Sequence, residues 1–240
     1  MFNVKSQEFD FRRGPIFANV ILADEINRAT PKTQSSLLEA MQERQVTVEG
    51  HTTILEDPFV VLATQNPVEL EGTYTLPESQ LDRFMFRLMV DYPTPEEGVR
   101  ILEYALKRTD VPDVAKIASR EEILEAKEFI RIAVHVEPDV LEYIVRIIEA
   151  TRKEKSKIAL GGSPKASVHL LSASRALAVL EGRDYVIPDD VKELAFSVLN
   201  HRVMLKAQYV AEVGALDNPF QYDLLNELIS SIVSTIEAPR

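Results

Sequence analysis

The sequence has 240 residues, 45% hydrophobic and 27% charged, so it can form one large or two modest globular domains. It has no cysteine, which excludes disulfides, thiolate zinc sites and cysteine nucleophiles, and its net charge of −11 argues against nucleic acid as a partner. The lack of cysteine suits a reducing cytoplasm, and no apolar run approaches the roughly 20 residues of a membrane span, so we expect a cytoplasmic protein without a membrane partner.

Strand and helix signals alternate over the first part of the chain. The apolar runs Ala18–Ala23 and Phe59–Thr64 are rich in β-branched residues and bounded by polar ones, which predicts strands buried on both faces of a parallel sheet. Between them, Thr30 is predicted to cap a helix whose first residue is Pro31. The pattern indicates an α/β domain over residues 1–92.

Three further elements are predicted in this domain. Residues 45–49 and 52–55 form the strands of a hairpin that turns at Gly50–His51. Phe9 and Phe11 alternate with Asp10 like a short strand, and residues 86–90 are predicted to be a third strand of the sheet.

Residues 93–240 show helical spacing of apolar residues and no strand signal, which predicts an all-helical second unit. The expected helices lie around residues 99–106, 123–133, 141–148, 164–180, 188–199 and 219–236.

Two adjacent carboxylates, Asp24 and Glu25, directly follow the first predicted buried strand. Ligand sites in open α/β sheets lie at the carboxyl ends of the strands. An Asp at this place can help to hold Mg²⁺ for ATP hydrolysis, and the next acid can polarise the attacking water. The alternative is an apolar strand followed by two solvated acids.

Two later segments add groups of the same kind. Asn66 follows the second buried strand, where its amide could bond a γ-phosphate or the attacking water, although Asn-Pro also starts many turns. Arg83 lies in the segment LPESQLDRF, where an arginine at a subunit edge could reach a neighbour's phosphate. It could equally be a surface arginine paired with Asp82 or Glu78.

Taken together, the three segments have a specific order and spacing. Residues 14–50 and 59–84 closely resemble the MoxR family of AAA+ ATPases, within the helix-2-insert group, and residues 161–202 resemble the lid of that family. The resemblance implies an α/β plus all-α fold, in which an incomplete parallel-sheet nucleotide-binding core precedes a helical lid.

The resemblance also implies roles for individual residues. Asp24 and Glu25 would be the Walker B pair, Asn66 would be sensor 1, and Arg83 would be the arginine finger that acts on a neighbouring subunit. Lys165 stands where the family usually has the sensor 2 arginine, so it keeps the charge but loses the bidentate fork. Arg175, further along the same helix, is a weaker alternative for that role.

The phosphate-binding sequence Gly-x-x-x-x-Gly-Lys-Ser/Thr does not occur in these 240 residues. In the family it precedes the helix-2 insert, and Phe2–Phe11 resembles the tail of that insert. The expectation is therefore a truncated chain that alone binds ATP poorly and hydrolyses it negligibly.

By resemblance, the parent protein is an ATP- and Mg²⁺-dependent chaperone-like ATPase that forms a ring, expected to be a hexamer. Its partners in the family are proteins with von Willebrand factor A domains. Two alternatives stay open at the level of sequence. One is a non-catalytic interaction module, and the other is a magnesium-chelatase-like or helicase-like subunit of the same group.

Overall fold

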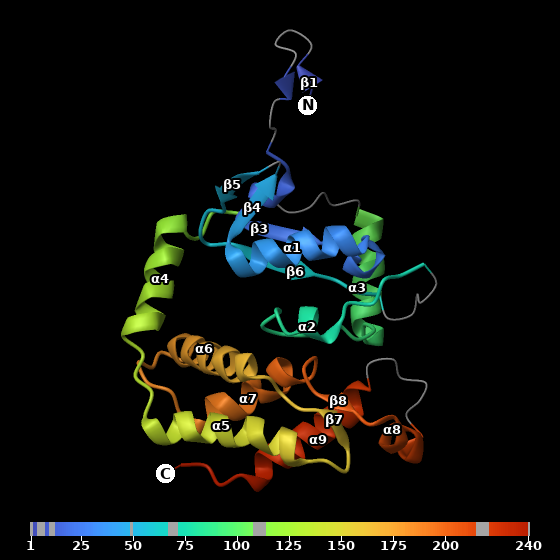
Figure 1. Cartoon of the computed structure of the whole chain (residues 1–240), viewed down its shortest axis with the longest axis vertical. Helices are drawn as coiled ribbons and strands as arrows, with labels where there is room; N and C mark the ends of the chain where they lie inside the picture. Colours follow the sequence, from blue (N-terminus) through green and yellow to red (C-terminus); the bar gives the residue numbers. More distant parts are fainter. Residues whose placement is uncertain are drawn as a thin grey trace.

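The computed structural model of the chain places an α/β part at one end and a helical part at the other (Figure 1). Helix α4 (Arg120–Ile132) runs along one side from the first part to the second, and α3 (Pro95–Lys107) lies on the opposite side. The structure describes residues 2–3, 8–9, 13–48, 50–66, 72–107, 114–214 and 221–239.

Two parallel strands form the sheet of the α/β part, β3 (Val20–Ala23) and β6 (Val60–Ala63), paired residue for residue along their length. The predicted parallel pairing is confirmed, but the prediction that both faces are buried is wrong. Helix α1 (Pro31–Glu43) packs on one face only, and the described residues provide no cover for the other. Four outward-facing apolar side chains are therefore 45–68% exposed, namely Val20, Leu22, Val60 and Leu62.

Helix α1 (Pro31–Glu43) begins as its sequence predicts. The Thr30 hydroxyl accepts a hydrogen bond from the Thr33 amide, which satisfies one of the free donors of the first turn. The hairpin that follows α1 is also confirmed, with strands β4 (Gln45–Val48) and β5 (His51–Ile54) antiparallel.

At the N-terminus, β1 (Phe2–Asn3) pairs with β2 (Glu8–Phe9) in antiparallel fashion. The predicted strand at Phe9–Phe11 is confirmed only at Phe9, because residues 10 and 11 lie outside the described residues.

The third strand predicted at residues 86–90 is wrong. After the short helix α2 (Glu78–Leu81), this segment has no regular secondary structure and no strand partner among the described residues. The Arg87 amide instead donates to the carbonyl of Ser197 in helix α7 (Pro188–Leu199), at 3.1 Å. Leu88 and Val90 are 72% and 94% exposed, so their alternation does not reflect a buried sheet face.

The second part of the chain is helical, apart from one short pair of strands. The predicted bounds of the helices at residues 164–180 and 188–199 are confirmed. The antiparallel strands β7 (Ile158–Leu160) and β8 (Met204–Leu205) correct the expectation of a strand-free unit, since such short strands carry no readable period. The remaining elements are α5 (Pro138–Lys153), α6 (Pro164–Leu180), α7 (Pro188–Leu199), α8 (Ala207–Val213) and α9 (Tyr222–Thr235).

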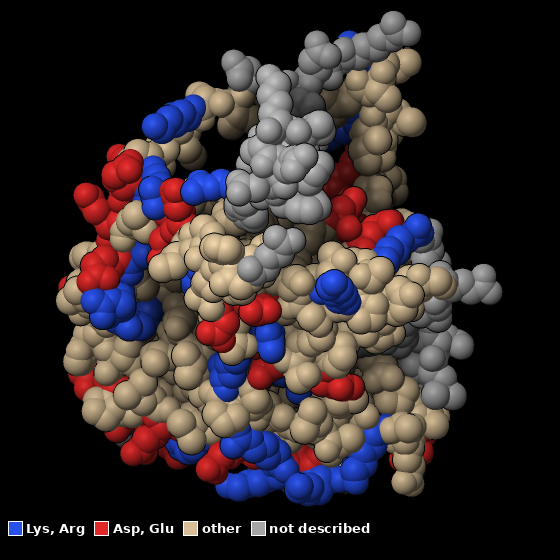
Figure 2. Space-filling model, turned by 45° about the horizontal axis from the view of Figure 1, so that its top comes forward, with Lys and Arg blue, Asp and Glu red and all other residues tan. Residues whose placement is uncertain are grey.

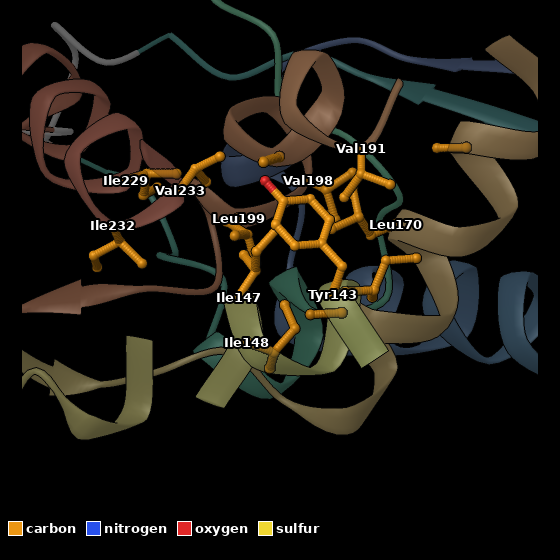
Figure 3. Close-up of a cluster of buried hydrophobic side chains, with 14 of the residues drawn as sticks. Tyr143, Ile147, Ile148, Leu170, Val191, Val198, Leu199, Ile229, Ile232 and Val233 are labelled. Carbon is orange, nitrogen blue, oxygen red and sulfur yellow. The ribbon is translucent and has the colours of Figure 1, made fainter. Parts of the chain in front are cut away.

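The main hydrophobic core lies among α5, α6, α7 and α9 (Figure 3). Burial of each large apolar side chain contributes about 1.5–3 kcal/mol, so this cluster dominates the stability of the chain. The α/β part has two much smaller clusters, one around Leu38 and one around Phe59. The side chains labelled in Figure 3 are Tyr143, Ile147, Ile148, Leu170, Val191, Val198, Leu199, Ile229, Ile232 and Val233.

Candidate nucleotide site at the sheet edge

The carboxyl ends of β3 and β6 bring two polar segments together. Ala23 pairs with Ala63, so Asp24 and Thr64 leave the sheet side by side. The Thr64 hydroxyl donates to Asp24 Oδ1 at 2.5 Å and accepts a hydrogen bond from the Glu25 amide at 2.8 Å. One hydroxyl therefore joins both predicted Walker B acids to the neighbouring strand.

Glu25 turns the chain away from the sheet. Its φ of 49° is left-handed, a conformation that few residues other than glycine adopt. The turn is held on both sides of Glu25, because the Ile26 amide also donates to the Thr64 carbonyl at 3.0 Å. The Glu25 carboxylate pairs with Arg28 Nε at 3.0 Å on the surface, where such pairs contribute little stability.

Asn66 lies two residues beyond Thr64 in the segment that leaves β6, and it is half-buried. The ends of β3 and β6 are directly paired. The segments that follow them contain all three predicted residues, Asp24, Glu25 and Asn66. This is the edge at which ligands bind in open parallel sheets.

The exposed carboxylate of Asp24 fits a magnesium ion that is shared with a nucleotide. Its Oδ1 takes the Thr64 hydroxyl, and its Oδ2 has no hydrogen bond to a described residue. Mg²⁺ in nucleotide sites is held by one or two carboxylates together with phosphates and waters. In the described segments, no group of three or more His, Asp or Glu side chains could hold a metal ion by itself.

Arg83 is held at a different place, beside helix α1. Its Nη1 donates to the Leu38 carbonyl at 3.1 Å, and its side chain is half-buried. It lines a hollow of about 270 Å³ between α1 and Gln80, on which the acids Glu39 and Glu43 also border. The hydrogen bonds of Arg83 do not include Asp24, Glu25 or Asn66.

Lys165 lies in the first turn of α6. Ser163 caps this helix by accepting a hydrogen bond from the Ala166 amide. Lys165 is half-buried and has no hydrogen bond or ion pair to a described residue. Arg175 instead donates to the carbonyls of Arg131 and Val134, which ties it to the end of α4.

The segment before Lys165 is positioned by close backbone packing. A Cβ at Gly161 would lie 2.8 Å from backbone atoms of Thr151 and Arg152, so only glycine fits there. The Thr151 hydroxyl accepts from the Gly162 amide at 2.9 Å, and Arg152 Nε donates to the Gly162 carbonyl at 2.7 Å. These contacts dock the start of α6 onto α5.

Comparison with known proteins shows which family the chain resembles. Residues 1–86 match the model of the ATPase family associated with various cellular activities (AAA), and residues 150–217 match that of the AAA lid domain. The chain is 48% identical over 205 residues to the uncharacterized protein YeaC of Bacillus subtilis, a match covering 85% of this chain and 63% of YeaC. It is 46% identical over 214 residues to the chaperone MoxR1 of Mycobacterium tuberculosis, covering 86% and 56%, respectively.

A solved structure shares the fold of the whole chain. The crystal structure of a "putative ATPase" from Cytophaga hutchinsonii matches with a TM-score of 0.86 and 37% identity, over 100% of this chain and 72% of that one. The chain belongs to the MoxR family of AAA+ ATPases. It spans less than two thirds of YeaC and of MoxR1. In the described part of this MoxR-family chain, no helix has the length and apolar character needed to cross a membrane.

Three important residues of this MoxR-family chain escaped the sequence analysis. Thr64 could have been found, because it holds the same place after β6 that Asp24 holds after β3. Asp82 was considered only as a surface partner of Arg83, whereas it pairs with Arg202 of the lid, Nε to Oδ1, at 2.7 Å. No local pattern marks that pair, since its members are 120 residues apart.

Two histidines beside Arg202 are held neutral by their surroundings. Burial, followed by the neighbouring Arg202 charge, lowers the pKa of His201 to about 3. The same two causes lower the pKa of His169 to about 4, and its Nδ1 accepts a hydrogen bond from Arg202 Nη2. Burial also lowers the pKa of Arg202, while Asp82 opposes that shift.

Proposed function

We propose that this chain carries the water-activating, sensing and trans-acting groups of an Mg²⁺-dependent ATPase that works as a ring, expected to be a hexamer. Such a ring would remodel or mature client proteins, and the relative MoxR1 of Mycobacterium tuberculosis is named a chaperone. The observation that carries the proposal is the joining of Asp24 and Glu25 to the adjacent strand end by Thr64.

Each group at the sheet edge has a distinct role in the proposed hydrolysis. Asp24 would help to hold Mg²⁺, which supplies charge neutralisation at the phosphates when it is bound. Glu25 would leave Arg28 and take the proton of the attacking water, since a surface ion pair costs little to break. Asn66 would bond the γ-phosphate or that water.

Arg83 bonds the Leu38 carbonyl and not the acids of its own chain. In this proposal, Arg83 is therefore assigned to the site of the neighbouring subunit in a ring. From the edge near Leu38 it would reach the γ-phosphate held by the next subunit and stabilise the charge of the transition state. Lys165, at the N-terminal end of a helix, would contact the phosphates from the lid.

Residues 1–92 would form the nucleotide-binding core in this account, and residues 93–240 the linker and lid. The 240 residues contain no Gly-x-x-x-x-Gly-Lys sequence to cradle the phosphates. We therefore expect the chain alone to hydrolyse ATP negligibly, although it holds the other groups that hydrolysis requires.

The test is to fuse the phosphate-binding segment of a MoxR relative ahead of residue 1 and to measure ATP turnover with and without Mg²⁺. We expect the fusion to hydrolyse ATP and Glu25→Gln to reduce kcat by roughly a hundredfold or more, because a general base contributes about 10²–10⁴-fold. Glu142→Gln, at an exposed position of α5, is the matched control and should leave turnover unchanged. A fusion whose turnover is the same with and without the Glu25→Gln substitution contradicts the proposal.

Proteins with von Willebrand factor A domains are proposed as partners from the family resemblance alone. Charge favours a protein partner over nucleic acid, since acidic and basic side chains are mixed over the face seen in Figure 2 and the net charge is −11. An ATPase activity of the fusion that DNA stimulates would favour the helicase-like alternative instead.

A further inference from the structure

The lid is bonded to both residues that flank Arg83. Arg202 follows helix α7, and only 1% of its side chain is exposed. Its Nε donates to Asp82 Oδ1 at 2.7 Å, and its Nη2 donates to the carbonyls of Asp82 and Phe84 at 3.1 and 2.5 Å. Arg83 lies between these two anchored residues.

Several donors of the Arg202 guanidinium reach this one segment. Nη1 also donates to the carbonyl of Met85 at 3.2 Å and to that of Val198 within the lid. A lysine has one compact ammonium group and cannot span such a set of acceptors, whereas the planar fork of arginine can. The burial of its charge also requires the nearby carboxylate of Asp82.

Asp82 has a second partner in the lid. The hydroxyl of Ser163 lies 3.0 and 2.9 Å from the two Asp82 carboxylate oxygens, within hydrogen-bond distance of each. Ser163 is also the cap of α6, two residues before Lys165. Lys165, which would contact phosphate from the lid, is therefore close in sequence to a residue that is hydrogen-bonded to Asp82. Asp82 in turn directly precedes Arg83, which would act on the next subunit.

We propose that Asp82, Arg202 and Ser163, here called the Asp82 link, position Arg83 according to the placement of the lid. In this proposal, which rests on the proposed function, a shift of α6 on nucleotide contact moves the Arg83 segment with it. Arg202 and Ser163 are positioning residues, since they act through Asp82 and do not touch the nucleotide.

The first arm of the test measures hydrogen exchange in the 240-residue chain and needs no hydrolysis. The Arg83 and Phe84 amides donate to the carbonyls of Gln80 and Leu81, so their protection reports the order of this segment. We expect Arg202→Lys to reduce protection there by about tenfold or more while α5 and α9 stay protected. Ser163→Gly, which largely preserves the helix cap, should give a smaller loss at the same amides.

Arg183→Lys is the matched control. Arg183 forms a bidentate pair with the buried Asp190 in the same lid, at 2.9 and 2.5 Å, and does not contact residues 82–84. It should leave the Arg83 segment protected. Equal loss of protection in the Arg183 and Arg202 variants would show a general weakening of the lid and overturn the proposal.

The second arm measures kinetics in the fusion that carries a phosphate-binding segment. Because a displaced arginine finger impairs the transition state, we expect Arg202→Lys to lower kcat by about ten- to a hundredfold with little change in KM for ATP. An unchanged kcat, or unchanged protection in the first arm, would overturn the link. Failure of the proposed function is seen separately, as a lack of effect of Glu25→Gln in the same fusion.

Discussion

Lowering the pH should weaken the contact between lid and core through His201. This side chain is 6% exposed, and its Nε2 donates to the Phe84 carbonyl at 3.0 Å. Its Nδ1 is buried and has no hydrogen-bond partner among the described residues. Protonation would place a charged, unpartnered N–H beside Arg202, which is why burial and that charge lower the pKa to about 3.

The sign and size of the effect follow from proton linkage. The folded pKa of His201 lies below the ordinary histidine value of 6.5, so the unfolded chain binds the proton more readily. The stabilisation from neutral His201 is fully present above about pH 6.5 and is lost as the pH falls towards 3. Between pH 7 and pH 5, the loss amounts to about 2 kcal/mol of unfolding free energy.

The assay is urea denaturation at pH 7 and pH 5 of the wild-type chain and of His201→Gln, which can still donate to Phe84 but does not titrate. The wild type should lose about 2 kcal/mol more than the variant over this interval. His135→Gln, at a mostly exposed histidine paired with Glu137, serves as the control. If the wild type and His201→Gln lose the same stability between the two pH values, the reasoning is refuted.

Three further predictions follow from single contacts. Gly161→Ala should lower the free energy of unfolding by about 1–3 kcal/mol in urea denaturation, because its Cβ meets the backbone of Arg152, and an unchanged value would contradict this. Tyr143→Phe should raise the free energy of unfolding by roughly 1 kcal/mol in thermal denaturation, since the Tyr143 hydroxyl is buried without a partner among the described residues. A lower free energy of unfolding in this variant would contradict the prediction. Thr64→Val should reduce ATP turnover of the fusion by about tenfold because the bonds to Asp24 and Glu25 are lost, whereas full activity would deny Thr64 this role.

Local signals were enough to predict much of the fold. The Thr30 cap and the strands at residues 20–23 and 60–63 follow from short-range propensities and from apolar runs. The parallel register of β3 and β6 then places Asp24 beside Thr64, so the convergence of two polar segments at the sheet edge could be anticipated.

The errors arose where contacts distant in sequence decide the structure. Residues 86–90 alternate like a strand, yet Arg87 Nε bonds the Asn200 side chain at 2.9 Å, and the Asn200 amide returns a bond to the Arg87 carbonyl at 3.0 Å. These lid contacts take the place of a sheet partner. The exposure of Leu22 and Leu62 could not be read from their apolar character, because burial depends on what covers the sheet.

A structure of the fusion bound to Mg²⁺ and a non-hydrolysable ATP analogue tests the central claim most directly. The account predicts Asp24, Glu25 and Asn66 of one subunit around the metal and the γ-phosphate, with Arg83 of the next subunit on the same phosphate. A nucleotide bound away from the ends of β3 and β6, or a γ-phosphate contacted by Arg83 of its own chain, would contradict it.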